Sequence, residues 1–314
     1  MREILFMEPV FKTMIWGGDR LHKEFEYSIP DHHTGECWAI SAHPKGDCRI
    51  RSGTYRGRSL SWLWDNHREL FGAMPGAVFP LLVKIIDARE DLSIQVHPDD
   101  AYAREREGGQ LGKTECWYIL DCPENGTLVL GHNARDRGEL RRMITENRWE
   151  ELIRLKPIRR SDFLQIEPGT VHAIKAGTLL LEIQQSSDIT YRLYDYDRLE
   201  HGKPRQLHLS QSIDVIHCPH VEQPMDSRVM VYPDCRLEEL IRCSYYAVVK
   251  LMLYGEQELT QVHRFMNMSV IRGEGTIDGT PIRKGDHFIL PAGYGTYLLQ
   301  GELELIGSYV PMNE

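Results

Sequence analysis

Residues 161–172 read SDFLQIEPGTVH, and residues 285–296 read GDHFILPAGYGT. Each copy predicts a strand, a turn containing Pro and Gly, and the start of a second strand. A duplicated β unit is the economical explanation of this similarity. The copies differ three residues after the turn glycine, where the first has His172 and the second has Thr296. We therefore expect the second copy to pack against the first without binding a metal ion.

Short β-rich runs separated by Gly, Pro and Asn continue on both sides of this repeat. Their spacing fits a sandwich or barrel better than alternating β-α units. Three helical patterns, at Leu60–Phe71, Asp99–Glu107 and Arg137–Leu155, predict a helical cap over a β core. The predicted strands are Phe79–Ile86, Leu92–Val96, Cys116–Leu120, Thr127–Leu130, Phe163–Ile166, Thr178–Gln184, Ala247–Leu253, Met268–Ile271, Phe288–Leu290 and Gly295–Leu299.

The composition is that of a soluble globular protein. The chain has 314 residues, 41 % of them hydrophobic, and a formal net charge of −9, which excludes general disorder. The acidic balance argues against nucleic-acid or membrane-surface binding, although a local pocket can still attract an anion. Seven cysteines without a C-x-x-C pair, and the lack of a signal peptide or apolar span, predict a cytoplasmic protein with reduced thiols.

The length suggests two domains, or one large domain with additions. The stretch Ile216–Leu240 is poor in regular pattern and contains several prolines, which is typical of a connection. We therefore expect an N-terminal unit with helical additions at residues 1–218, a connection at 219–240, and a C-terminal unit at 241–314.

Polar side chains interrupt two of the apolar runs. In the segment Asp91–Pro98, strand alternation places Gln95 and His97 on the same face. In GKTECWY at residues 112–118, it places Lys113 and Glu115 on the same face. The first pair could be the polar outer face of a half-exposed strand, and the second could be a cross-strand ion pair. Both could also be ligands or substrate contacts.

His172 directly follows the tight turn of the repeat, where a histidine either binds a metal ion or stabilises the turn. Together with Gln95, His97 and Glu115 it offers two imidazoles, one carboxylate and one amide oxygen. This donor set suits a divalent transition ion, above all zinc. Nitrogen and oxygen ligands of this kind leave room for water or substrate.

Two further cations stand out from their surroundings. Lys84 lies in the strand Phe79–Ile86, which is apolar on both faces, so its burial requires a partner or a function; the alternative is an edge lysine whose ammonium reaches solvent. Arg192 lies in an aromatic-rich strand and suits bidentate contact with phosphate or carboxylate. A structural ion pair of Arg192 with Asp188 or Asp195 is the competing interpretation.

These residues belong to motifs that resemble a known family. The chain is similar to the type I mannose-6-phosphate isomerases, in motif order and over nearly its whole length. It resembles their short bacterial branch, because the long helical insert of the larger members is absent. Thr114 stands where those larger members usually have proline. The motifs are IWGG at 15–18, GECW at 35–38, IQVHP at 94–98, GKTECW at 112–117, PGTVHA at 168–173, EIQ at 182–184 and TYR at 190–192.

The resemblance implies an all-β fold of duplicated cupin (jelly-roll) barrels with a few short helices on the N-terminal part, and one zinc ion per chain. It implies a reaction that interconverts mannose 6-phosphate and fructose 6-phosphate. By motif position, the family's zinc ligands fall on Gln95, His97, Glu115 and His172, and its substrate-site residues on Lys84, Lys113, Asp188 and Arg192.

We therefore expect a zinc-dependent aldose–ketose isomerase that works through an enediol, with a phosphosugar as its substrate. Lys113 and Asp188 are the candidates for the general base. Arg192, with help from Lys84 and Lys113, is the candidate for phosphate recognition. A metal cupin oxygenase is one alternative, but it has no use for these three cations together. A catalytically silent sugar-binding cupin is another, and it would be expected to lack a ligand or a cation.

Overall fold

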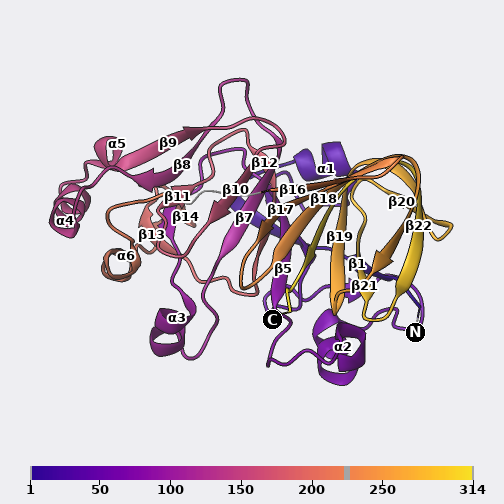
Figure 1. Ribbon diagram of the computed structural model, residues 1–314. Coiled ribbons are helices and arrows are strands. Elements are labelled where there is room, and N and C mark those ends of the chain that lie inside the picture. The colour runs from indigo at the N-terminus through magenta and orange to yellow at the C-terminus, as the bar shows by residue number, and fades with distance from the viewer. Residues whose placement is uncertain (1, 223–226, 313–314) are drawn as a thin grey trace.

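The computed structural model describes residues 2–222 and 227–312 and consists mainly of strands (Figure 1). Strands account for about 45 % of the residues and helices for 14 %, so the predicted mostly-β fold with few helices is confirmed. The helices are α1 (Arg20–Phe25), α2 (Leu60–Asn66), the 3₁₀ helix η1 (Arg68–Phe71), α3 (Asp100–Arg106), α4 (Arg137–Thr145), α5 (Trp149–Leu152) and α6 (Leu209–Val215).

The strands form three main sheets and one small hairpin. The six-stranded sheet has the order β10 (Phe163–Ile166), β7 (Glu115–Asp121), β12 (Leu179–Gln185), β5 (Leu81–Asp87), β3 (Thr34–Ile40), β2 (Val10–Gly18). The five-stranded sheet has the order β13 (Tyr191–Tyr194), β6 (Ile94–Val96), β11 (His172–Ala173), β8 (Thr127–His132), β9 (Ile153–Pro157). The hairpin pairs β14 (Leu199–Glu200) with β15 (Lys203–Pro204).

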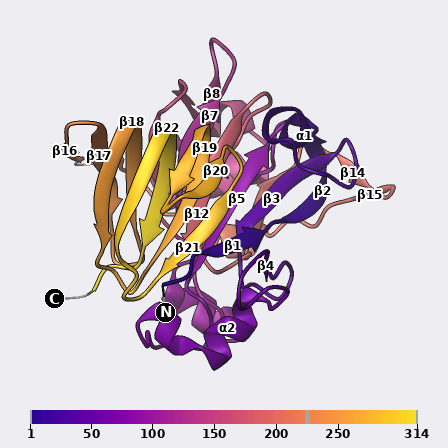
Figure 2. The ribbon, with the colours of Figure 1, turned by 90° about the vertical axis from the view of Figure 1, so that its right-hand side faces the viewer.

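The third sheet has nine strands and contains the C-terminal part of the chain (Figure 2). Strand β20 (Thr280–Arg283) pairs only with β19. The order of the other strands is β16 (Arg228–Val231), β17 (Cys235–Arg242), β18 (Ala247–Gln261), β22 (Gly295–Tyr309), β19 (Phe265–Ile277), β21 (His287–Pro291), β1 (Leu5–Glu8), β4 (Arg49–Ile50). Strands β1 and β4 thus extend the C-terminal sheet, although they lie near the start of the chain.

The six-stranded sheet is the middle layer of the molecule. Leu81, Val83 and Ile85 of β5 belong to a core that also contains Phe265 and Ile306 of the nine-stranded sheet. The opposite face contributes to a second core, shared with the five-stranded sheet, whose members include Ile86, Trp117, Leu128 and Leu130. Because both of its faces are covered, β5 is buried throughout, which explains its almost continuous apolar sequence.

The two copies of the repeat have the same turn geometry. Gly169 and Gly293 occupy equivalent positions and both have left-handed φ angles, 80° and 67°, which glycine adopts without steric cost. Asp162 and the equivalent Asp286 each accept a hydrogen bond from the backbone N–H three residues earlier, at 2.8 and 2.9 Å. The predicted duplication is therefore real at the level of the strand–turn–strand unit.

The predicted pair of closed barrels is not confirmed. In the described part of the chain the end strands of each sheet are paired on one side only, so none of the sheets closes on itself. The repeat motif constrains a turn and two strand segments, but closure depends on pairing between strands far apart in sequence.

Two predicted stretches differ in their local structure. The helix expected at Arg137–Leu155 ends at Thr145, because Asn147 has a φ of 55°, and the chain leaves α5 directly into β9. The stretch expected to be a connection contains β16 and most of β17, which pair with each other. Residues 223–226 of that connection lie outside the described residues. None of the helices within the described ranges is long and apolar enough to cross a membrane.

Candidate active site

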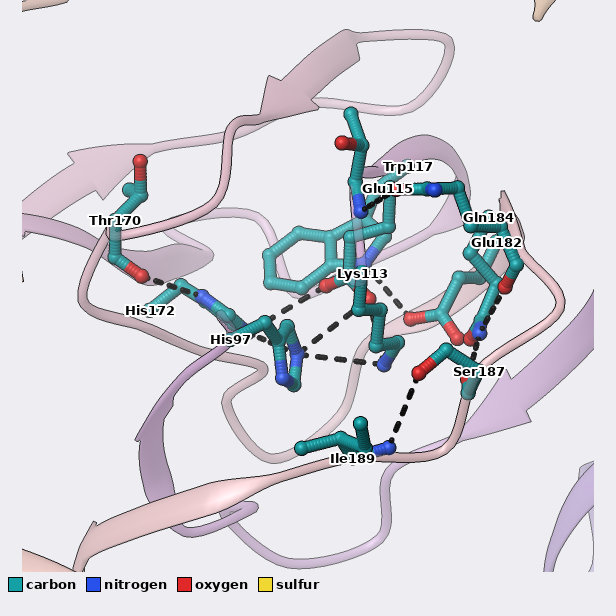
Figure 3. Close-up of polar contacts among 12 residues, drawn as sticks. His97, Lys113, Glu115, Trp117, Thr170, His172, Glu182, Gln184, Ser187 and Ile189 are labelled. Atoms are coloured by element: carbon teal, nitrogen blue, oxygen red, sulfur yellow. Dashed lines mark hydrogen bonds and ion pairs between the residues drawn. The ribbon is translucent and has the colours of Figure 1, made fainter. Parts of the chain in front are cut away.

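The space between the five- and six-stranded sheets contains a buried group of potential metal ligands. His97 follows β6 and His172 begins β11 on the five-stranded sheet, whereas Glu115 begins β7 on the six-stranded sheet. One ligand atom from each residue lies within 4.8 Å of the others. Figure 3 shows these three side chains and the Lys113 ammonium pointing toward one another. The three predicted ligands therefore meet in space.

The backbone fixes the orientation of the His172 ring. Its Nδ1 donates a hydrogen bond to the carbonyl oxygen of Thr170 at 2.9 Å, so the lone pair of a neutral ring is on Nε2. That Nε2 faces Nε2 of His97 at 3.1 Å. Burial lowers the pKa of His172 to about 4, and burial with the nearby Lys113 lowers that of His97 well below its usual range. Both rings are thus neutral, as metal ligands must be.

Glu115 supplies the carboxylate of this donor set. Both of its oxygens are buried; Oε2 pairs with the Lys113 ammonium, whereas Oε1 accepts no hydrogen bond from the described residues. Oε1 lies 3.4 Å from His172 Nε2, and Oε2 lies 3.6 Å from His97 Nε2. Ligand atoms around a tetrahedral zinc ion at ~2.0–2.1 Å are about 3.3 Å apart. The spacing and the free lone pairs of Oε1 therefore fit a bound divalent metal ion.

Lys113 lies beside this group. Its Nζ is 2.7 Å from Glu115 Oε2 and donates a hydrogen bond to His97 Nε2 at 3.3 Å. The ammonium is nearly buried but still lines the neighbouring cleft. The face shared by Lys113 and Glu115 is thus as predicted, and Lys113 is positioned between the ligand group and the space open to a substrate.

Gln95 lies beside His172 on the five-stranded sheet. On the five-stranded sheet it pairs with His172 on one side and with Arg192 on the other. Residues paired across strands share a face, so the Gln95 side chain is on the same side as both neighbours and lines the cleft. This position is compatible with the predicted role of Gln95 as a fourth metal ligand.

A cleft of about 430 Å³ opens beside these groups. Its lining includes six basic and three acidic side chains, as well as Trp16 and Trp38. An excess of positive charge in this cleft contrasts with the net charge of −9 for the whole chain. The basic residues are Lys12, Lys45, Lys84, Lys113, Arg192 and Arg205, and the acidic ones are Glu36, Glu182 and Asp188.

Lys84 is buried with a carboxylate partner on the adjacent strand. It pairs with Glu182 in the sheet register, and its Nζ lies 3.0 Å from Glu182 Oε1. Trp117 Nε1 donates a hydrogen bond to the other oxygen of Glu182 at 3.0 Å. Against the effect of burial, Glu182 and Glu36 raise the pKa of Lys84 above its usual value. Lys84 is therefore a fixed cation at the edge of the cleft.

Asp188 lies in the cleft lining but is already paired. Lys45 Nζ is 2.6 Å from its Oδ2, and His43 Nε2 is 3.4 Å from its Oδ1. The contact with His43, reinforced by Lys45, holds the pKa of Asp188 well below its usual range. A carboxylate held in this way is a weak proton acceptor near neutral pH.

Arg192 has no carboxylate partner among the described residues, so neither Asp188 nor Asp195 forms the structural pair considered from the sequence. Instead Nε donates to Ser93 Oγ at 3.2 Å, and Nη1 donates to the Gln206 carbonyl oxygen at 3.1 Å. Burial lowers the pKa of the guanidinium somewhat, but arginine stays charged. It is thus a cation with spare hydrogen-bonding capacity at the cleft.

Sequence reasoning missed several residues of the cleft. Glu182 is a buried acid in the apolar run of β12, and the argument applied to Lys84 would have singled it out. Glu36 lies within a family motif but was assigned no role. No local sequence pattern marked Arg205 as a cleft residue. Its partner Asp195 is ten residues away in the sequence, and the two meet only in the folded chain.

Comparison with known proteins agrees with the fold and with the family resemblance. Residues 4–124 match the model for the catalytic domain of type I phosphomannose isomerase, and residues 237–310 match that for the mannose-6-phosphate isomerase cupin domain. The chain is 48 % identical to the mannose-6-phosphate isomerase ManA of Bacillus subtilis over 98 % of this chain and 99 % of ManA. It is 43 % identical to the mannose-6-phosphate isomerase of Streptococcus mutans, with 98 % and 99 % covered.

Solved structures give the same result. The crystal structure of the Bacillus subtilis mannose 6-phosphate isomerase superposes with a TM-score of 0.97 at 46 % identity, covering 98 % of this chain and 99 % of that one. The phosphomannose isomerase of Salmonella typhimurium, in its apo form, shares the fold with a TM-score of 0.77 at 15 % identity, covering 99 % and 100 % of the two chains. The chain belongs to the type I phosphomannose isomerase family.

Proposed function

We propose that this protein is a zinc-dependent isomerase that interconverts mannose 6-phosphate and fructose 6-phosphate. The observation that supports it best is the buried His97–Glu115–His172 group beside a cleft with excess positive charge. A phosphosugar needs both features, since its phosphate requires cations and its carbonyl chemistry requires charge stabilisation. Family membership supports the same reaction, because the Bacillus subtilis and Streptococcus mutans relatives are named as mannose-6-phosphate isomerases.

His97, Glu115 and His172 would hold the metal ion, and Gln95 would be the fourth ligand. When bound, such an ion polarises the carbonyl and hydroxyl oxygens of the open-chain sugar and stabilises negative charge on them. Thr170 keeps Nε2 of His172 unprotonated, which is a typical outer contact of a metal-binding histidine.

The seven free cysteines support a reducing, cytoplasmic location.

Lys113 is the stronger of the two candidates for proton transfer. By the enediol route, a side chain takes a proton from C2 and returns it to C1, and Lys113 would take it as a neutral amine. Lys113 lines the cleft and contacts two of the proposed ligands, so it lies where the reacting carbons must be placed. Asp188 is held as a carboxylate by Lys45 and His43, which suits orientation of a sugar hydroxyl better than proton uptake. Lys84, fixed by Glu182, suits substrate contact.

The division of the chain into residues 1–218, 219–240 and 241–314 remains part of this proposal. The C-terminal unit would stabilise the catalytic layer without binding metal. Its two candidate ligands have other contacts: His287 hydrogen-bonds through both ring nitrogens, at 2.8 Å to Tyr27 and at 2.8 Å to Ser269. His263 stacks on Tyr309.

Recognition of the phosphate predicts strong discrimination between phosphorylated and free sugar. We expect kcat/KM for mannose to be at least about a thousandfold below that for mannose 6-phosphate, because several charge-assisted hydrogen bonds would be lost. Replacing Arg192 with Ala should lower kcat/KM for mannose 6-phosphate and leave the slow reaction of mannose almost unchanged. A coupled assay for each product measures both. Equal turnover of the two sugars would contradict the proposed function.

The enediol route predicts exchange with solvent. If a side chain carries the proton between C2 and C1, fructose 6-phosphate formed in deuterated water should contain deuterium at C1. Mass spectrometry of product from the first few per cent of conversion measures this incorporation. Product with complete C2-to-C1 transfer and no solvent deuterium would favour a hydride shift or a fully shielded base over an exchanging one.

A further inference from the structure

The basic side chains of the cleft differ in how far the protein itself neutralises them. Lys45, Lys84 and Lys113 each have a carboxylate within 3.0 Å. Lys12 and Arg192 have no such partner within the described ranges. Lys12 lies over the Trp38 ring and donates to the Lys45 carbonyl oxygen. Arg205 shares with a third arginine the one carboxylate that it contacts in these ranges. Where β13 and the segment after β15 meet, two neighbouring cations of the cleft are therefore not fully neutralised by the protein. An anionic group of the ligand would be attracted to this end of the cleft.

Arg205 is held rigidly in this place by Asp195. Its Nε and Nη2 donate to the two carboxylate oxygens at 2.7 and 2.5 Å, which is the bidentate geometry that fixes a guanidinium plane. Asp195 is only 4 % exposed, and Arg198 also donates to it, at 2.6 Å. Two arginines on one buried carboxylate leave a net positive charge. Arg205 Nη1 has no acceptor in the part of the chain that the structure describes, and its side chain lines the cleft.

The backbone joins Arg205 to Arg192. The residue after Arg205, Gln206, accepts a hydrogen bond from Arg192 Nη1 at 3.1 Å. Two residues further, the backbone N–H of His208 donates to the Arg192 carbonyl oxygen at 2.8 Å. The two arginines are close enough that Arg205 contributes to lowering the pKa of Arg192. No carboxylate of the described residues contacts both arginines, so a ligand with two negative charges would stabilise this pair of like charges.

We propose that Arg205 is a second phosphate-binding residue, which forms a dianion subsite together with Arg192, and that Asp195 is its positioning residue. The inference rests on the proposed function, since it assigns the substrate's phosphate to one end of the cleft. A phosphate monoester has a charge of about −1.5 to −2 at pH 7, which matches two guanidinium groups. The sugar then extends from this subsite toward Lys113 and the ligand group.

The test compares Arg205→Gln with Lys203→Gln. Lys203 is exposed on β15 of the same hairpin, so the control removes an equal charge nearby without touching the subsite. We expect Arg205→Gln to raise KM for mannose 6-phosphate about 10- to 100-fold, the range for a lost charged hydrogen bond, with kcat changed less than about threefold. Lys203→Gln should leave both constants unchanged. Unchanged KM in Arg205→Gln would overturn the inference, as would an equal rise in the control.

Asp195 tests the positioning role. Asp195→Asn, like Arg205→Gln, should raise KM for mannose 6-phosphate without lowering kcat. Asp195→Glu, which keeps the carboxylate, should raise KM less than Asp195→Asn does. A general loss of folding would instead lower the amount of active enzyme and leave KM unchanged, so the split between the constants separates the two causes. If Asp195→Asn does not fold, the Arg205→Gln result alone decides the proposal.

Direct anion binding separates this inference from the proposed reaction. Titration calorimetry with inorganic phosphate should show weaker binding to Arg205→Gln than to the wild type or to Lys203→Gln, by about tenfold or more. This difference in phosphate affinity is expected even if the wild type does not turn over mannose 6-phosphate. In that case the proposed reaction would be wrong, and the phosphate subsite would still be supported. Equal phosphate affinity in the three proteins would overturn the subsite, whatever the reaction.

Discussion

Replacing His97 and His172 with Ala should remove the metal ion and reduce isomerase activity roughly a thousandfold or more. The two rings supply both nitrogen donors of the group, and one carboxylate with an amide oxygen is a weak site for a transition ion. The bound ion contributes several kcal/mol of charge stabilisation, which corresponds to this loss in rate. Elemental analysis and the rate of fructose 6-phosphate formation on the same sample measure both effects.

The matched control replaces His263 and His287 with Asn. His263 lies just before β19 and His287 begins β21 in the C-terminal part of the chain, where we expect no metal ion. Metal content should stay at about one ion per chain, because the proposed ligands are untouched. Full metal content in the His97→Ala, His172→Ala protein would contradict the assignment of these residues as metal ligands. Loss of metal in the control would indicate a metal site in the C-terminal unit.

Replacing Lys113 with Met should lower kcat by about 10²- to 10⁴-fold, the range for loss of a positioned proton carrier. The ammonium lies 2.7 Å from Glu115 and 3.3 Å from His97, so metal content must be measured on the same variant. If the metal is retained, the loss of kcat belongs to the proton transfer. Asp188→Asn should lower kcat far less, because His43 and Lys45 already hold this carboxylate.

Lys45→Met is the control for charge in the same cleft. Lys45 lines the cleft and pairs with Asp188, but its side chain is largely exposed, and surface ion pairs contribute little. We expect a change in kcat of less than about tenfold. Normal kcat in both Lys113→Met and Asp188→Asn would exclude the two candidates, and the base would then be sought elsewhere in the cleft, with Lys84 next.

Strand alternation predicted local facing correctly, and this accounts for much of the site. It placed Lys113 and Glu115 on one face, and their side chains are in contact. The apolar run around Lys84 predicted a strand buried on both sides, and β5 is covered by a sheet on each face. These successes share a cause, since a period of two residues determines which side chains share a face.

Contacts across the chain could not be predicted in this way. Periodicity does not say which strand pairs with which, so it gave no sign that β1 lies beside β21 or that Lys45 reaches Asp188. The end of the helix at Thr145 depends on one left-handed residue, Asn147. The apolar positions beyond it continue at helical spacing, so pattern alone extended the helix too far.

The family resemblance added what the residues alone left open. The residues alone predict a metal site and a set of cations, but each motif also has a structural alternative. A structural ion pair of Arg192 is excluded, because Arg192 has no carboxylate partner in the described ranges. A solvent-facing position of His97 is also excluded, because its ring faces His172 and Glu115. The ligand group is thus supported by geometry as well as by resemblance.

The central claim is that this protein isomerises mannose 6-phosphate with a metal ion held by His97, Glu115 and His172. It is tested most directly by a coupled assay for fructose 6-phosphate on purified protein, before chelation, after chelation and after zinc is restored. We expect activity in the first sample, loss of nearly all of it in the second, and recovery in the third. Undiminished activity in protein shown by elemental analysis to be free of metal would contradict it.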